Sequence, residues 1–137
     1  MITVDLVPEQ FSAQERTVLR AGQFHVTAGR SASGIELLTI ANAVGRVVVL
    51  PFTGQQVWDA VFHGRRLTMR SIFDEPVPTS NYLENYGSYL IHCGGSAMGN
   101  PGPDDTHPLH GELPNLRLKS AALRVATAGD DSPLTLT

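Results

Sequence analysis

The alternation of apolar and polar positions between residues 24 and 69 predicts a series of short β-strands. In QFHVTAGR, Phe24, Val26 and Ala28 fall on one face of an extended chain, and polar side chains fall on the other. Further runs of this kind follow: IELLTIAN, GRVVVLPF and QQVWDAVF. HGRR, at residues 63 to 66, is typical of a hairpin turn. Regularly spaced strands with Gly-containing turns indicate an all-β sandwich or barrel.

The alternation stops after residue 70 and returns near the end of the chain. Prolines and glycines are frequent between residues 76 and 103, which predicts ordered but irregular chain. Within it, NYLENYGSYLIHC predicts one short helical or irregular segment near residues 80–92. Strand-type alternation resumes around LRLKSAALRV, AGDDSP is a predicted turn, and LTLT begins another predicted strand.

Length and charge limit the classes of function. A chain of 137 residues with 42% apolar residues is sufficient for one globular domain. A net charge of −3 argues against nucleic acid and anionic lipid as partners, because both require a basic face. No apolar run approaches the roughly 20 residues of a membrane helix. The one cysteine, Cys93, excludes an internal disulfide, which fits a reducing compartment. Together these observations lead us to expect no membrane association and a cytoplasmic location.

The stretch DDTHPLHGELPN, residues 104 to 115, is the densest in groups that bind metals or move protons. A metal site is one interpretation, with His92, His107, His110 and Glu112 as ligands. Pro108 separates the two histidines of this stretch and makes a helical pair improbable, so we predict no metal. The other interpretation is acid–base chemistry on a polyhydroxylated substrate, since histidine titrates near neutral pH. The structural alternative makes His92 a buried core residue, His107 a loop residue and Glu112 a partner of a loop amide.

Two longer segments resemble the N-terminal part of the aldose 1-epimerase (galactose mutarotase-like) superfamily, in its uncharacterised aldose-epimerase-like branch. They are GRVVVLPFTGQQVWDAVFHGRRLTMRSIFD and ENYGSYLIHCGGSAMGNPGPDDTHPLHGELPN. The resemblance extends from about Gly34 onward, and HPLHGELPN is similar to the family's LHG signature. It implies an antiparallel β-supersandwich, a small-molecule sugar as partner, no cofactor, and interconversion of sugar anomers by acid–base ring opening.

The resemblance also implies roles for particular residues. His110, in LHG, matches the family histidine close to the sugar ring, and we expect it to be catalytic. We expect His107, Glu112, Asn115 and His92 to contact the substrate. This branch has LHGE where classical mutarotases have LHGG, which leaves the preferred sugar and the strict reaction type open. The family's general acid and general base belong to later segments, beyond Thr137.

We therefore expect residues 1–137 to be the N-terminal part of a single mutarotase-like β-sandwich domain, truncated and inactive alone. Part of a supersandwich should expose strand edges, which predicts self-association. Two alternatives to an epimerase remain: a sugar-binding module without catalysis, and a metal-dependent sugar isomerase that uses the histidines and Glu112.

Overall fold

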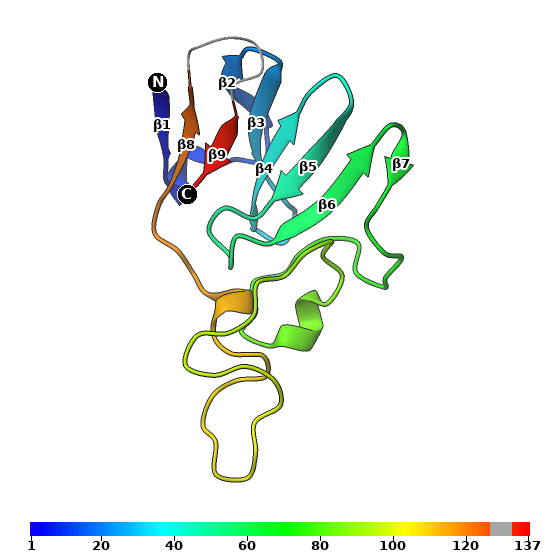
Figure 1. Cartoon of the computed structure of the whole chain (residues 1–137), viewed down its shortest axis with the longest axis vertical. Coiled ribbons are helices and arrows are strands. Elements are labelled where there is room, and N and C mark those ends of the chain that lie inside the picture. Colours follow the sequence, from blue (N-terminus) through cyan, green and yellow to red (C-terminus); the bar gives the residue numbers. More distant parts are fainter. Residues whose placement is uncertain (127–132) are drawn as a thin grey trace.

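A computed structural model describes residues 1–126 and 133–137 of the chain. Two antiparallel sheets pack face to face in a sandwich, which confirms the predicted all-β class (Figure 1). The smaller sheet has the order β1-β8-β9: β1 Ile2–Leu6, β8 Ala121–Val125 and β9 Leu134–Leu136. The larger has the order β2-β3-β4-β5-β6-β7: β2 Arg16–Ala21, β3 Phe24–Arg30, β4 Glu36–Ala41, β5 Gly45–Val49, β6 Val57–Phe62 and β7 Arg65–Arg66.

The helical residues within the described part of the chain form 3-10 turns: η1 Pro8–Gln10, η2 Tyr82–Asn85 and η3 Leu113–Asn115. Of the segment predicted near residues 80–92, only η2 is helical, and the rest is irregular. No helix among the described residues has the length and apolar character needed to cross a membrane. The predicted strand at LTLT is confirmed as β9, whereas the AGDDSP turn, apart from Pro133, lies outside the described residues.

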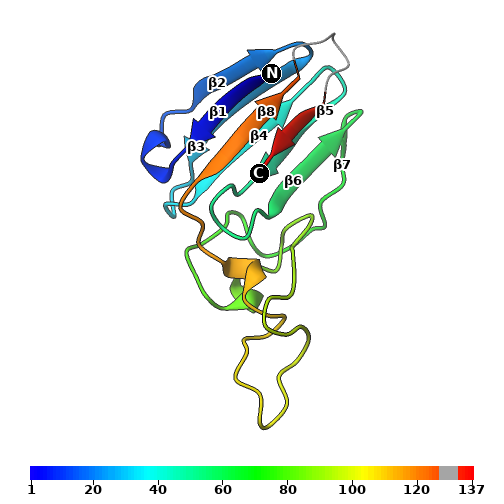
Figure 2. The ribbon, with the colours of Figure 1, turned by 60° about the vertical axis from the view of Figure 1, so that its left-hand side comes forward.

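The main core lies between the two sheets. Figure 2 shows the small sheet lying across the larger one. The buried apolar side chains come from both sheets and the adjoining loops: Leu6, Phe11, Leu19, Val26, Ala28, Leu38, Phe52, Ala121, Leu123 and Val125. Phe52 is fully buried and meets Phe11 edge to face, with ring centroids 5.3 Å apart. Burying these side chains is the principal stabilisation of the sandwich.

Local chemistry determines the hairpin turns. Between β6 and β7, His63 and Gly64 both have positive φ, 49° and 73°, as a two-residue hairpin loop requires. The hairpin predicted at HGRR is therefore confirmed. Between β4 and β5, the Asn42 side chain accepts hydrogen bonds from the N–H groups of Val44 and Gly45, both at 3.0 Å. These bonds replace backbone partners in the turn.

A long loop region covers one end of the sandwich, at the bottom of Figure 1. Backbone hydrogen bonds attach it to the larger sheet, because Val57 and Leu90 exchange both N–H···O bonds at 3.0 Å. Gln56 is fully buried and attaches the loop a second time, donating from Nε2 to the Pro114 carbonyl at 2.6 Å. Ser88 donates to Oε1 of the same side chain at 2.6 Å. The predicted site residues lie in this loop region.

An apolar hollow lies on the larger sheet, at the end where β3 and β5 begin and β4 and β6 end. Its volume is about 130 Å³, and its lining includes Phe24, Ile40, Val47 and Phe62. Ile40 pairs with Val47 across β4 and β5 and also packs against the main core, so the hollow lies on the face that the small sheet covers elsewhere. We propose that a second chain pairs with β9, the edge strand of the small sheet. Light scattering should then show a molecular mass that rises with concentration; a monomer throughout would contradict it.

Candidate functional site

His110 occupies a strained turn whose backbone is fully hydrogen-bonded. Its φ is +62°, a left-handed conformation that is uncommon for residues other than glycine. Its N–H donates to the Gly99 carbonyl at 2.9 Å, and its carbonyl accepts from the Gly94 N–H at 2.8 Å. The side chain is half-buried, and neither ring nitrogen has a hydrogen-bond partner among the described residues. The loop therefore holds the imidazole in place without occupying its nitrogens.

The ring of His110 lies against Tyr82, the first residue of η2. The two ring centroids are 4.5 Å apart and the planes are tilted by 52°. Burial raises the pKa of Tyr82 above its ordinary value, and the neighbouring Cys93 and Tyr86 raise it further. Tyr82 is therefore a neutral hydroxyl at physiological pH, beside the Cys93 thiol.

His107 and Glu112 both bind within their own loop. Nδ1 of His107 is 2.8 Å from the Pro108 carbonyl, and its Nε2 is 3.8 Å from the Asp105 carboxylate. Glu112 accepts from the Ser96 N–H at 2.8 Å and from the Ser96 hydroxyl at 2.5 Å. These hydrogen bonds hold the pKa of Glu112 below its usual range, so it is an ionised loop-closing group. A loop-amide partner was the structural alternative for Glu112, and contact with sugar stays a prediction.

Asn115 and His92 line two different pockets. Asn115 accepts from the Asn85 side chain at 3.4 Å and lines a pocket of about 470 Å³ together with Thr53, Ser80 and Arg117. His92 is exposed, so its interpretation as a core residue was wrong. It lines a pocket of about 310 Å³ with Gly54, Gln55, Cys93, Leu113, Leu116 and Leu118. His110 lines neither of these two pockets; its ring contacts Tyr82, which adjoins Cys93 of the smaller pocket.

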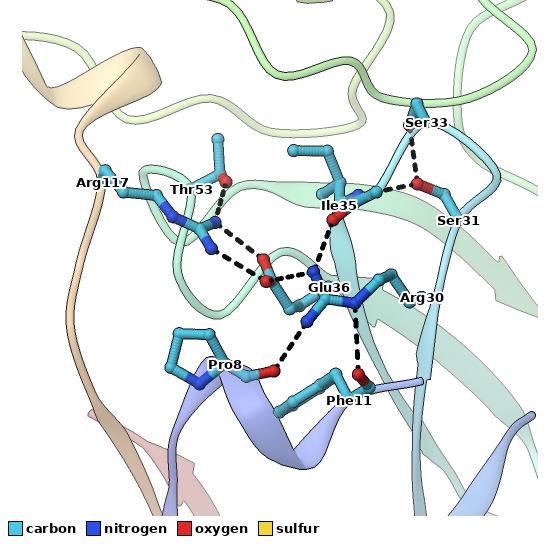
Figure 3. Close-up of polar contacts among 10 residues, drawn as sticks. Pro8, Phe11, Arg30, Ser31, Ser33, Ile35, Glu36, Thr53 and Arg117 are labelled. Atoms are coloured by element: carbon cyan, nitrogen blue, oxygen red, sulfur yellow. Dashed lines mark hydrogen bonds and ion pairs between the residues drawn. The ribbon is translucent and has the colours of Figure 1, made fainter. Parts of the chain in front are cut away.

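A buried carboxylate beside the larger pocket was missed by sequence reasoning. Glu36, at the start of β4, has an exposed fraction of only 1% and lies between two arginines (Figure 3). Arg117 donates to both of its oxygens, at 2.7 and 2.8 Å, and Arg30 lies 2.9 Å from Oε1. Arg30 also donates to the carbonyls of Pro8 and Phe11. The signal available in the sequence was a single acid inside the apolar run IELLTI, because a buried acid requires a cationic partner.

Charge and burial oppose one another at Glu36. Burial alone would raise the pKa of its carboxyl, but the hydrogen bonds from Arg117 and the positive charges of Arg117 and Arg30 outweigh it. The pKa of Glu36 is therefore lowered. The same pairing raises the pKa of Arg117. This cluster connects β3, β4 and the chain after η3, and so positions the loop that carries Asn115.

The described residues do not gather a metal site. No group of three or more His, Cys, Asp or Glu side chains in residues 1–126 and 133–137 could hold a metal ion. His107 and Glu112 are engaged in separate hydrogen bonds, with Pro108 and with Ser96. The arrangement therefore gives no support to the metal-dependent isomerase.

Comparison of the chain with protein-family models, curated proteins and solved structures found no match. Membership of the aldose 1-epimerase superfamily therefore stays a prediction that depends on the motifs from Gly34 onward.

Proposed function

We propose that this chain is the sugar-binding part of an aldose-1-epimerase-type enzyme and that His110 is one of its acid–base groups. One observation carries the proposal. Within DDTHPLHGELPN, His107 and Glu112 are engaged in hydrogen bonds with their own loop. Both ring nitrogens of His110, in contrast, are free of hydrogen bonds to described residues. A histidine that transfers a proton needs a free nitrogen directed at the substrate.

The pocket beside His92 is the best candidate to receive the sugar. Its volume of about 310 Å³ is at the lower end of small-molecule sites, which span about 300–1,000 Å³. Leu113, Leu116 and Leu118 provide apolar surface for the C–H face of a pyranose. Gln55 and His92 provide hydrogen-bonding groups for its hydroxyls. Cys93 lines the same pocket and adjoins Tyr82, which contacts His110.

The proposed reaction is a proton exchange without redox change. A base removes the proton of the anomeric hydroxyl while an acid protonates the ring oxygen, and the C1–O5 bond breaks to give the open-chain aldehyde. Rotation about the C1–C2 bond and reversal of both proton transfers form the other anomer. A neutral imidazole at His110 can accept a proton and its protonated form can donate one, so the residue suits either transfer.

Replacing His110 by asparagine should lower anomer exchange at least about tenfold with little loss of stability. Asparagine tolerates the positive φ of this position, whereas alanine would add backbone strain to the loss of the imidazole. Saturation-transfer NMR on glucose and galactose measures the exchange. Because the resemblance assigns the other proton-transfer groups to residues beyond Thr137, the protein assayed should include the reading frame downstream.

Two results would contradict the assignment. One is unchanged exchange in His110→Asn, and the other is an equal loss of exchange in the matched variant His63→Asn. His63 also has positive φ but lies in the β6–β7 turn.

A sugar-binding module without catalysis is the second candidate. It is favoured by the internal hydrogen bonds of Glu112 and His107, which engage two of the groups in this loop that could transfer a proton. Sugar-induced chemical-shift changes at Gln55 and His92, without anomer exchange in the extended protein, would support it over the enzyme.

A further inference from the structure

A further pocket lies beyond β7, at the edge of the larger sheet. Its volume is about 230 Å³, and it is lined by Arg66, Met69, Arg70, Ser71, Phe73 and Asp74. Segment 71–73 adjoins Gly87, where an added Cβ would lie 2.7 Å from the Ser71 hydroxyl. None of the residues predicted to bind sugar lines this pocket.

Both arginines of this pocket have guanidinium N–H donors without a partner among the described residues. Arg66 uses Nε to donate to the Asp59 carboxylate at 2.8 Å, and no described residue accepts from its terminal nitrogens. Arg70 has no hydrogen-bond or ion-pair partner among the described residues. Guanidinium groups in this state favour planar, bidentate pairing with oxyanions.

The nearby acid Asp59 is already paired with two arginines. Its carboxylate also accepts from the Thr68 hydroxyl at 2.6 Å and lies 3.6 Å from Arg46, and its side chain is only 13% exposed. Burial would raise the pKa of Asp59, but the Thr68 hydroxyl, Arg66 and Arg46 together lower it, so the carboxylate remains ionised. Asp59 therefore keeps Arg66 in position and competes little with an incoming anion.

Positive charge is concentrated here although the chain as a whole is acidic. The segment HGRRLTMR, residues 63 to 70, carries three arginines and no acid, whereas the net charge of the chain is −3. Asp74 is the acid that lines the pocket, against Arg66 and Arg70. The balance at the pocket favours an anion over a cation or a neutral ligand.

We propose that this pocket binds a small phosphate-type oxyanion through Arg66 and Arg70. The anion is either inorganic phosphate or the phosphate group of a small ester. The proposal does not depend on sugar chemistry at His110.

Titration of the full chain with inorganic phosphate at constant ionic strength tests the proposal. We expect saturable binding by calorimetry, with NMR shift changes at the amides of residues 69–74. Arg70→Gln should weaken binding about tenfold, since it removes one of two guanidinium groups and breaks no bond of the fold. Asp74→Asn should tighten binding, because it removes the repelling carboxylate. Arg65→Gln is the matched control: it removes the same charge from β7 without altering the pocket lining.

Parallel titrations identify the source of the anion. Glucose 6-phosphate and galactose 1-phosphate are compared with inorganic phosphate and with the unphosphorylated sugars. Tighter binding of the esters identifies a phosphate ester as the ligand, and equal binding identifies the free anion. Absence of binding to any phosphate, or equal weakening in Arg70→Gln and Arg65→Gln, would overturn the proposal.

Discussion

Replacing Glu36 by alanine should destabilise the chain by about 2–4 kcal/mol, the largest single effect that we expect from a charged residue. The carboxylate is buried and receives three contacts from Arg117 and Arg30. Its removal leaves two guanidinium groups facing each other at a cavity. The cost is lower than for a fully buried pair because the side chains of Arg117 and Arg30 are 51% and 31% exposed and can regain water. Urea unfolding followed by circular dichroism measures the loss.

The contribution of Glu36 should also depend on pH, with a definite sign. Its pKa is lowered in the folded chain from an ordinary value of 4.5. A depressed carboxyl pKa gives stabilisation that is complete above the unfolded pKa and is lost as the pH falls through the folded pKa. Stability should therefore fall below about pH 4.5, and this acid limb should be shallower in Glu36→Gln. A residual slope is expected from Asp59, whose pKa is also lowered.

Asp5→Ala is the control for Glu36. Asp5 is an exposed carboxylate in β1 without an ion pair among the described residues, so its loss should change stability by less than about 0.5 kcal/mol. Equal destabilisation by the two substitutions would mean that the Arg117–Glu36–Arg30 cluster does not hold the sandwich to the loop.

Replacing Gly111 by alanine should open the loop that carries His110, at a cost of about 2–4 kcal/mol. Its φ is +84°, and an added Cβ would lie 2.2 Å from the Gly94 carbonyl oxygen and 2.4 Å from that of Ala97. Gly94 also holds the loop closed, because its N–H donates to His110 and its carbonyl accepts from Leu113. Hydrogen exchange should therefore speed up at the amides of Gly94 and Leu113, while the amides of β3 and β4 stay protected.

Gly99→Ala separates backbone strain from steric overlap. Gly99 also has positive φ, 93°, but an added Cβ there would meet no atom within 4 Å. It should cost only about 1 kcal/mol, the conformational part of the effect. If the two glycine variants open the loop equally, close packing against Gly94 and Ala97 does not determine its conformation.

The sequence by itself predicted the strands from residue 24 onward and the β6–β7 turn, but it did not predict β1 or β2. Apolar positions that alternate along 24–30 and 121–125 became β3 and β8, and the His63–Gly64 turn lies where its residues predicted. These features depend on neighbours two to four residues apart, so a linear pattern contains them. The segment near residues 80–92 was predicted less sharply. The pattern left a helical and an irregular conformation open, and only Tyr82–Asn85 is helical.

Tertiary structure decided which polar groups are engaged in hydrogen bonds or ion pairs. Glu36 meets Arg117 across 81 positions of sequence, and Ser96 meets Glu112 across 16. In DDTHPLHGELPN the two histidines are equivalent candidates, yet the fold binds His107 to its own loop, whereas no described residue binds the ring nitrogens of His110. Arg66 and Arg70 likewise differ through their neighbours in space. Folding places the Asp59 carboxylate beside Arg66 and no hydrogen-bond partner among the described residues beside Arg70. The physical reason is that hydrogen bonds and ion pairs form between atoms a few ångströms apart in space, whereas sequence patterns describe neighbours along the chain.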